Sequence, residues 1–379
     1  MIGTRASELL RVVHENPDIT RADAARRVGI GTGAATELVA RLTAAELISE
    51  RPAGPAGRGR PTTVLQPHPR GPLVLGVAFA HETWRAEVVQ LGGEVVASDG
   101  DEQMAGAYGE GERILLEVKA RLTRLRRRFR GRIRGMGVSV PGLVAMDRLV
   151  EASTLGWSGL DMGILWPNAP VVALGNDATF AASAESCRGA AVGAAVALHV
   201  RVDAGLGGAL VESGRVLTGA VGLGGEFGHM PFAPDDVHCP CGARGCWGAS
   251  LDGGALARLL GEPAPTEPVA YARRVVARAA RAGAGSPEHD AVTAVAARLG
   301  RGIAGLVNAV DPDLVTVGGL GVDYLAAASR ALDDAYLAGL MAFRRKDPPP
   351  VLAAELLEGG PVAGAAEEAW ARLWPLLPT

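Results

Sequence analysis

One histidine and three cysteines are gathered between residues 229 and 246 of this 379-residue chain. They are His229, Cys239, Cys241 and Cys246, with the spacing H-x9-C-x-C-x4-C. One imidazole and three thiolates at this spacing can close a tetrahedron around a zinc ion. Four protein ligands leave no position for water, so the pattern predicts a structural rather than a catalytic zinc. The alternative is a chance cluster on a glycine-rich loop.

Length and composition favour a soluble, globular protein of roughly two or three domains. The hydrophobic content is 48% and the formal net charge is −3. We expect a cytoplasmic location and no membrane partner, because neither a signal peptide nor a spanning segment of about 20 apolar residues is apparent. Of the four cysteines only Cys187 lies outside the cluster. This distribution argues against a disulfide framework and fits a reducing compartment.

The first 70 residues are basic and predict a DNA-binding unit. They hold ten Arg against seven Asp or Glu, which suggests a polyanionic partner. Apolar periodicity predicts a first helix that ends before Pro17, a second over 20–28 that is capped by Thr20, and a third over 32–43. Two helices joined by a short glycine-containing turn are typical of a helix-turn-helix, whose second helix enters the major groove of double-stranded DNA.

Few long side chains stand at the start of the third predicted helix. Thr32, Thr36 and Glu37 are the exposed early positions that would face base edges, and Arg41 would lie near the phosphates. Small side chains make direct base readout weak, so the operator sequence cannot be derived and indirect readout is expected to contribute.

A wing is predicted next along the chain. Residues 47–50 and 62–66 have strand character, and proline and glycine dominate the segment between them. Arg58 and Arg60 in this segment could enter a narrow minor groove, where the negative potential attracts guanidinium groups. The alternative for these two arginines is a flexible interdomain linker.

The rest of the chain has the pattern of an α/β body. Predicted strands cover 73–80, 83–90, 94–97, 135–140 and 314–317, and predicted helices cover 111–128, 269–282 and 291–310. A strongly basic stretch over 124–134 is typical of a solvated helix end, with a second DNA contact as the alternative.

Several segments, in this order, resemble the ROK family of repressors and sugar kinases. They are the N-terminal unit, the strand and turn over 137–142, the pair Asn176-Asp177, the segment 224–229 and the cysteine cluster. The resemblance covers essentially the whole chain. It implies a winged helix-turn-helix domain followed by an actin-like (sugar kinase/ribonuclease H-like) α/β body of two lobes with a ligand cleft between them.

The resemblance also implies a domain division and an assembly. The domains would be a DNA-binding domain over 1–70, a first lobe over 71–175 with 362–379, and a second lobe over 176–361. The second lobe would carry the zinc site and the dimerisation surface. The implied assembly is a homodimer or homotetramer.

Both phosphate-binding loops of the family's kinases are altered in this sequence. Those kinases carry Asp-x-Gly-Gly-Thr after the first strand, where this chain has Ala, Phe, Ala, His, Glu and Thr over 78–83. The glycines of such a loop let backbone N–H groups approach phosphates. The family's Gly-Thr-Gly appears as Asp203-Ala204-Gly205, which places a carboxylate beside the expected phosphates. Both changes argue against ATP use, so we expect no catalytic residues.

The sugar-binding half matches the family more closely. The matching residues, which hydrogen-bond sugar hydroxyls in the relatives, are Asn176, Asp177, Glu226 and His229. A glutamate two residues after the last cysteine is replaced by Gly248, and Thr154 stands where relatives commonly have Asn. Loss of a carboxylate acceptor should cost on the order of 1.5–3 kcal/mol of binding. Either the effector is not a plain hexose or it binds weakly; alternatively, Glu226 and Asp177 satisfy backbone groups in a vestigial cleft.

The sequence as a whole predicts a DNA-binding transcriptional regulator, a repressor, which is controlled by a sugar or a related metabolite between the lobes. Its predicted partners are a double-stranded DNA operator, the small-molecule effector and further copies of the chain. Two alternatives stay open: a ROK-type sugar kinase with an appended DNA-binding domain, and a regulator whose body is a scaffold that senses nothing.

Overall fold

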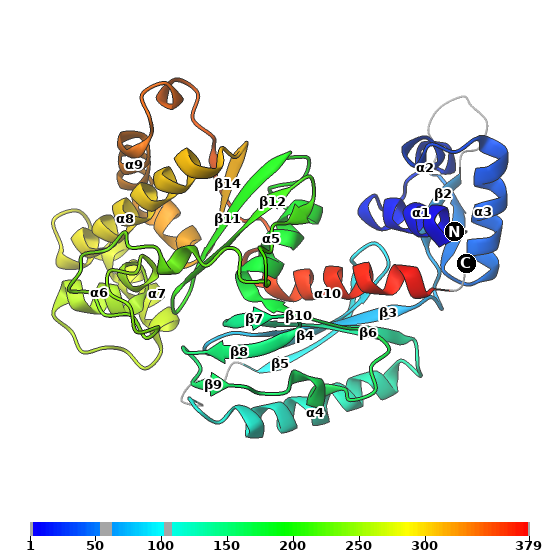
Figure 1. Ribbon diagram of the computed structural model, residues 1–379, viewed down its shortest axis with the longest axis horizontal. Coiled ribbons are helices and arrows are strands. Elements are labelled where there is room, and N and C mark those ends of the chain that lie inside the picture. The colour runs from blue at the N-terminus through cyan, green and yellow to red at the C-terminus, as the bar shows by residue number, and fades with distance from the viewer. Residues whose placement is uncertain (1–2, 54–62, 102–107, 378–379) are drawn as a thin grey trace.

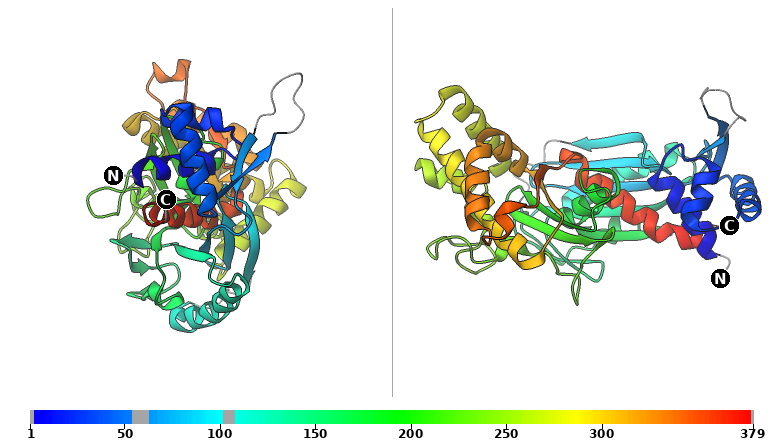
Figure 2. Two further views of the ribbon diagram at one scale, coloured as in Figure 1. Left: turned by 90° about the vertical axis from the view of Figure 1, so that its right-hand side faces the viewer. Right: turned by 90° about the horizontal axis from the view of Figure 1, so that it is seen from above.

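The structure is a computed structural model that describes residues 3–53, 63–101 and 108–377. An N-terminal unit, formed by 3–53 and 63–67, is followed by two lobes (Figure 1). The N-terminal unit lies at one end of the elongated molecule and the second lobe lies at the other (Figure 2). None of the described helices combines the length and the apolar character needed to span a membrane.

The N-terminal unit has three helices and a two-stranded antiparallel sheet. Its elements are α1 (Gly3–Glu15), α2 (Arg21–Val28), α3 (Thr32–Ala44), β1 (Ile48–Pro52) and β2 (Thr63–Pro67). The Thr20 hydroxyl caps α2 by accepting a hydrogen bond from the Asp23 N–H at 3.1 Å, as predicted. The Asp23 carboxylate accepts from the Thr20 hydroxyl rather than from a backbone N–H, so only half of a capping box is present. Gly29 ends α2 in the left-handed region with φ 71°.

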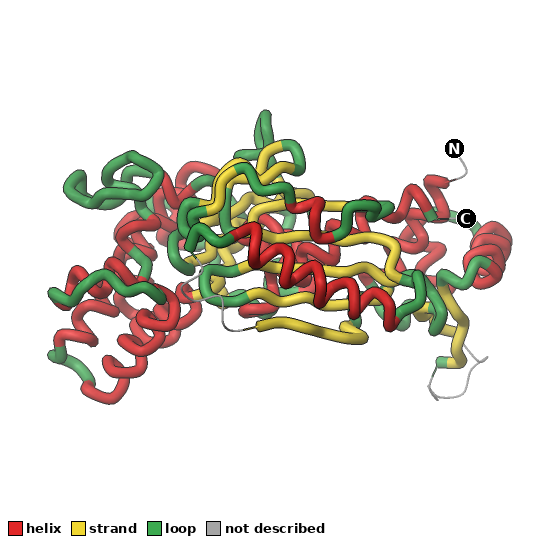
Figure 3. Tube along the Cα trace, turned by 90° about the horizontal axis from the view of Figure 1, so that it is seen from below, coloured by secondary structure: helices red, strands yellow, loops and turns green. Residues whose placement is uncertain are grey.

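The first lobe is built on a five-stranded sheet in the order β10-β6-β3-β4-β5. The strands are β3 (Leu73–Phe79), β4 (Trp84–Gln90), β5 (Val95–Asp101), β6 (Ile133–Val140) and β10 (Val172–Asn176). One face is crossed by α4 (Gly111–Arg128), which lies nearest the viewer in Figure 3. The other face is covered by α10 (Gly360–Leu373), whose backbone touches the sheet: a Cβ on Gly137 would lie 1.8 Å from the carbonyl oxygen of Ala365.

The second lobe has a sheet in the order β13-β12-β11-β14-β15, with helices packed beside it. The strands are β11 (Val196–Val202), β12 (Leu206–Glu212), β13 (Arg215–Val216), β14 (Leu314–Gly319) and β15 (Val351–Ala353). The helices are α6 (Gly253–Leu260), α7 (Pro268–Ala282), α8 (Pro287–Val310) and α9 (Leu320–Gly339). Between the two lobes, α5 (Asp177–Arg188) packs against α10 and contacts β12 and β11.

Most predicted elements are present with small shifts at their ends. The helix over 111–128 has its predicted limits, and the helix over 291–310 begins four residues earlier, at Pro287. A third sheet of β7 (Leu143–Ala145), β8 (Arg148–Ala152) and β9 (Trp157–Ser158) was not predicted, because strands of two to five residues carry little alternation. Short 3₁₀ helices occupy Met162–Leu165, Phe227–His229, Gly248–Ser250, Arg344–Lys346, Leu357–Gly359 and Trp374–Leu376.

Candidate functional site

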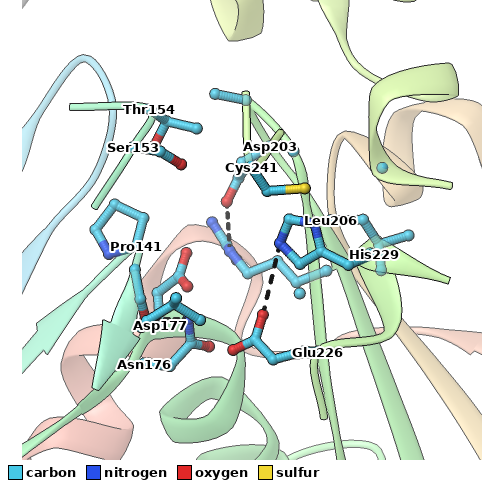
Figure 4. Close-up of a pocket in the computed structure, with 18 of the residues that line it drawn as sticks. Pro141, Ser153, Thr154, Asn176, Asp177, Asp203, Leu206, Glu226, His229 and Cys241 are labelled. Carbon is cyan, nitrogen blue, oxygen red and sulfur yellow. Dashed lines mark hydrogen bonds and ion pairs between the residues drawn. The ribbon is translucent and has the colours of Figure 1, made fainter. Parts of the chain in front are cut away.

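A cavity of about 300 Å³ is lined by residues of both lobes. Asn176 and Asp177 reach it from the junction of β10 and α5, and Glu226 and His229 reach it from the segment that follows β13 (Figure 4). The four residues named from the resemblance are therefore neighbours in space, although 49 positions separate Asp177 from Glu226 in sequence. The cavity has room for a small polar molecule.

Asn176 has a structural role that the sequence pattern did not reveal. Its side-chain oxygen accepts hydrogen bonds from the N–H groups of Ala178 at 2.9 Å and Thr179 at 3.2 Å, which caps α5. Its amide nitrogen donates to the carbonyl oxygen of Gly142 at 3.0 Å. One amide hydrogen remains available to a ligand. Asn176 therefore fixes the start of α5 against the turn after β6.

Asp177 and Glu226 present carboxylates to the cavity (Figure 4). Burial raises the pKa of Asp177, and the positive charge of Arg201 opposes that rise. Burial, followed by the charge of Asp177, raises the pKa of Glu226 to about 6. Two partly desolvated acceptors on one cavity favour a ligand that offers several hydrogen-bond donors, as a polyhydroxy compound does.

His229 is shared between the cavity and the cysteine cluster. Its Nδ1 lies 3.8 Å from Sγ of Cys239, and its Nε2 lies 3.8 Å from a carboxylate oxygen of Glu226. One ring nitrogen therefore faces the thiols while the other faces the cavity. A metal held at Nδ1 would fix the direction of the Nε2 group, because the two nitrogens belong to one rigid ring.

The four residues of the cluster converge as a metal site requires. Their ligand atoms all lie within 4.8 Å of one another, and the Sγ atoms of Cys241 and Cys246 are 3.8 Å apart. A tetrahedron with Zn–S bonds of about 2.3 Å has S···S edges of about 3.8 Å. Backbone hydrogen bonds hold the loop in this shape, including one from the Cys239 N–H to the Ala243 carbonyl at 3.0 Å. The donor set can therefore hold a metal ion such as zinc.

Arg201 is a buried cation beside the cavity that the sequence reading did not single out. It is 4% exposed and lies at the end of β11. Its Nε donates to Asp203 at 2.6 Å and its Nη2 donates to Glu358 at 3.0 Å. Burial raises the pKa of Asp203 to about 7 against the opposing effect of Arg201. The alternation of His199 and Arg201 within an apolar strand was the available sequence signal.

Glu82 bridges the two lobes. It belongs to the turn between β3 and β4, where the resemblance placed a phosphate loop, and its carboxylate accepts hydrogen bonds from two N–H groups of α7. The distances are 3.0 Å to Val269 and 3.2 Å to Ala270. With Asp203 and Glu358 it lines an adjoining cavity of about 1030 Å³. Arginines line this cavity as well, and Arg201 pairs with both Asp203 and Glu358.

The replacement at Gly248 has not left a hole. A Cβ at this position would lie 2.8 Å from the backbone nitrogen of Leu206, so the chain has closed around the glycine. Asp252, one turn further on, lines the same cavity and caps α6 through the Ala255 N–H at 2.8 Å. Burial raises the pKa of Asp252 to about 6. Sequence reasoning missed Asp252 because a helix-capping aspartate is common.

Four of the six residues predicted to contact DNA belong to α3. Thr32, Thr36 and Glu37 are exposed, and Arg41 is half-buried, while Ala35, Leu38, Val39 and Leu42 form the buried face as predicted. The Thr36 hydroxyl donates to the carbonyl oxygen of Thr32 at 2.9 Å. Arg58 and Arg60 lie outside the described residues.

Sequence relatives include both regulators and kinases. The chain is 26% identical over 330 residues to a putative xylose repressor from Caldicellulosiruptor sp. (strain Rt8B.4), with 82% of this chain and 81% of that protein covered. It is 30% identical over 201 residues to a glucokinase from Halalkalibacterium halodurans, with 49% of this chain and 61% of the glucokinase covered.

Solved structures share the fold. A ROK family transcriptional regulator, a homologue of the E. coli MLC protein, superposes with a TM-score of 0.77 at 21% identity over 99% of this chain and 97% of its own. A ROK family glucokinase from Streptomyces griseus, in complex with glucose and AMPPNP, gives a TM-score of 0.65 at 24% identity over 78% of this chain and 99% of its own. Residues 81–372 match the ROK family itself. The chain therefore belongs to the ROK family.

Proposed function

We propose that this protein is a DNA-binding transcriptional regulator, a repressor, whose body binds a sugar or a related metabolite in the cavity between its lobes. The observation that carries the proposal is that one chain joins a three-helix unit to a body in which Glu82 stands where the resemblance placed a phosphate-binding loop. The regulator that superposes over nearly the full chain and the xylose repressor relatives support it.

In this proposal the N-terminal unit is a winged helix-turn-helix that spans residues 1–70. The first lobe spans 71–175 with 362–379, and the second spans 176–361. Thr32, Thr36, Glu37, Arg41, Arg58 and Arg60 contact the operator. A structural zinc, held by His229 and the three cysteines of the cluster, fixes the cavity loop. The chain acts as a homodimer or homotetramer, because symmetric operators are matched by symmetric proteins.

Replacing Arg58 and Arg60 together with alanine should weaken operator binding by at least about tenfold, because two minor-groove cations are lost.

Replacing Arg41 with alanine should weaken binding to all DNA sequences similarly. It should also lower the slope of log affinity against log salt concentration by about one, because one phosphate contact is lost. The measurement is selection of bound fragments from random and genomic DNA, followed by titration of the enriched site.

The matched control is Arg11→Ala, which removes an exposed arginine of α1 that pairs with Glu15. It should leave the enriched sequence and its affinity unchanged. If the folded, metal-loaded wild type enriches no sequence at all, the regulator assignment is wrong.

Replacing Glu226 with glutamine should weaken sugar binding roughly ten- to a hundredfold, because a charged acceptor for hydroxyl groups is lost. A thermal-shift screen over pentoses, hexoses, N-acetylhexosamines and their phosphates supplies the ligand, since a compound that binds only the native state raises its stability. Glu212→Gln, at the exposed end of β12, is the control and should bind like the wild type.

Two observations favour other functions. Because some relatives are kinases, one alternative is that this protein is a sugar kinase with an added DNA-binding domain. Sugar-dependent consumption of ATP would support that alternative. Gly248 favours a scaffold that senses no small molecule. A screen in which no sugar or sugar phosphate shifts the melting temperature would support the scaffold.

A further inference from the structure

A buried polar cluster lies where the N-terminal unit meets the body, and we call it the joint. It consists of His14 from α1, the Gly92 turn between β4 and β5, Arg188 at the end of α5, and Glu367 from α10. Nδ1 of His14 accepts a hydrogen bond from the Gly92 N–H at 3.0 Å, and its Nε2 lies 2.7 Å from a carboxylate oxygen of Glu367 and 2.6 Å from Nη2 of Arg188. Nε of Arg188 donates to the other carboxylate oxygen at 2.6 Å.

The joint is largely closed to solvent, with Arg188 as its most exposed side chain. Arg188 also donates to the carbonyl oxygen of Gly92 at 2.8 Å, and a Cβ on Gly93 would lie 2.4 Å from its guanidinium carbon. The rings of Trp370 and Trp374 cover the His14 ring at centroid distances of 5.7 and 5.2 Å. Such dense packing restricts the polar groups of the joint to few arrangements.

The charges of the joint depend on one another. Burial alone would raise the pKa of Glu367, but His14 and Arg188 lower it to about 2. The carboxylate is therefore ionised and its two oxygens are shared between two parts of the molecule, α1 and α5. A shift of either helix breaks a buried, charge-assisted hydrogen bond.

Two helices lead from the cavity to the joint. α5 starts at Asp177 in the cavity and ends at Arg188 in the joint, a span of roughly 18 Å for 12 residues. α10 runs from between the lobes to the N-terminal unit (Figure 1), and it starts beside Glu358, the partner of Arg201. The two helices touch backbone to backbone, since a Cβ on Gly364 would lie 1.8 Å from the carbonyl oxygen of Phe180.

We propose that the joint couples the cavity to the orientation of the N-terminal unit through α5 and α10. A molecule in the cavity that favours one position of α5 would change the pairing of Arg188 with Glu367, and His14 would carry that change into α1. Closely packed helices move as rigid bodies and change between discrete sets of contacts. A cluster that joins two such helices can therefore control their relative position. The inference rests on the proposed function, because it makes the joint the route by which an effector acts on DNA binding.

Hydrogen exchange of the full-length, metal-loaded protein tests the coupling without DNA or ligand. Asn176→Ala removes the cap of α5 and disturbs its cavity end. We expect it to raise exchange of α1 amides about fivefold in the wild-type background and to have no effect on them in a Glu367→Gln background. Glu367→Gln alone should raise α1 exchange roughly tenfold.

Ser7→Ala is the matched control, because the Ser7 hydroxyl donates a hydrogen bond to the carbonyl oxygen of Trp374 in the same interface but outside the joint. It should keep the response of α1 to Asn176→Ala. Equal responses in the wild-type and Glu367→Gln backgrounds, no response in either, or loss of the response in Ser7→Ala would each overturn the coupling. Failure of the wild type to bind DNA would instead overturn only the proposed function.

Discussion

Replacing Cys246 with serine is expected to abolish zinc binding and to lower the free energy of unfolding by about 4–5 kcal/mol. Cys246 is fully buried, whereas most of the loop between Pro231 and Gly245 is exposed and contributes little apolar packing. The metal would therefore be the main constraint on this loop, and a metal that binds only the native state stabilises it directly. Urea denaturation together with metal analysis measures both effects.

Cys187→Ser is the control for this experiment, since Cys187 lies on α5 outside the cluster. It should retain one zinc per chain and lose only about 1 kcal/mol. Stripping zinc from the wild type should weaken both effector and operator binding, because His229 belongs to the cavity and to the metal site. A Cys246→Ser protein with full zinc and wild-type stability, or an apo protein with unchanged operator affinity, would contradict this account.

Replacing Arg201 with methionine should cost about 3 kcal/mol of stability, because Asp203, whose side chain is 22% exposed, loses its cation. This is the lower end of the range for breaking a buried pair, since Glu358 is half exposed and keeps Arg273 as a partner. The double change Arg201→Met with Asp203→Asn should recover most of the loss. Arg273→Met, which removes a more exposed arginine, should cost less than about 1 kcal/mol.

The loss at Arg201 should depend on pH. Burial already raises the pKa of Asp203 to about 7 in the wild type, and removal of Arg201 would raise that pKa further. A carboxyl whose pKa is higher in the folded than in the unfolded state binds protons more tightly when folded, so it destabilises the fold once it ionises. The variant should therefore lose stability as pH rises from about 4 through 7 and beyond. Urea unfolding at pH 5 and pH 8 checks this, and a pH-independent deficit would exclude Asp203 as its source.

How well each part could be predicted depends on the distance in sequence between interacting residues. The cluster of His229 and three cysteines lies within 18 positions, so its spacing in sequence was enough to predict that the four side chains converge. Helix limits such as 111–128 follow from local periodicity and capping. The cavity residues were predicted from the resemblance. The structure adds that the side-chain amide of Asn176 hydrogen-bonds to the backbone of α5 and of Gly142.

The remaining contacts could not be predicted because their partners are remote. Glu82 meets α7 some 187 positions later, and Arg201 meets Glu358 after 157 positions. No periodicity links such residues, since their pairing depends on how the two lobes pack. The altered residues over 78–83 could be recognised in the sequence. The start of α7, whose N–H groups bind the Glu82 carboxylate, could not.

The contact between His14 and Glu367 spans 353 positions, and this separation sets an order of events during synthesis. The N-terminal unit emerges from the ribosome first and can form its local helices at once. Its hydrophobic core, however, is completed by Trp370, Leu373 and Trp374 of the last helices. A nascent chain that lacks these residues has an N-terminal unit without its docking partner. Docking of the unit on the body thus waits for the last helices of the chain, as does the covering of the first-lobe sheet by α10, and both are exposed to C-terminal truncation.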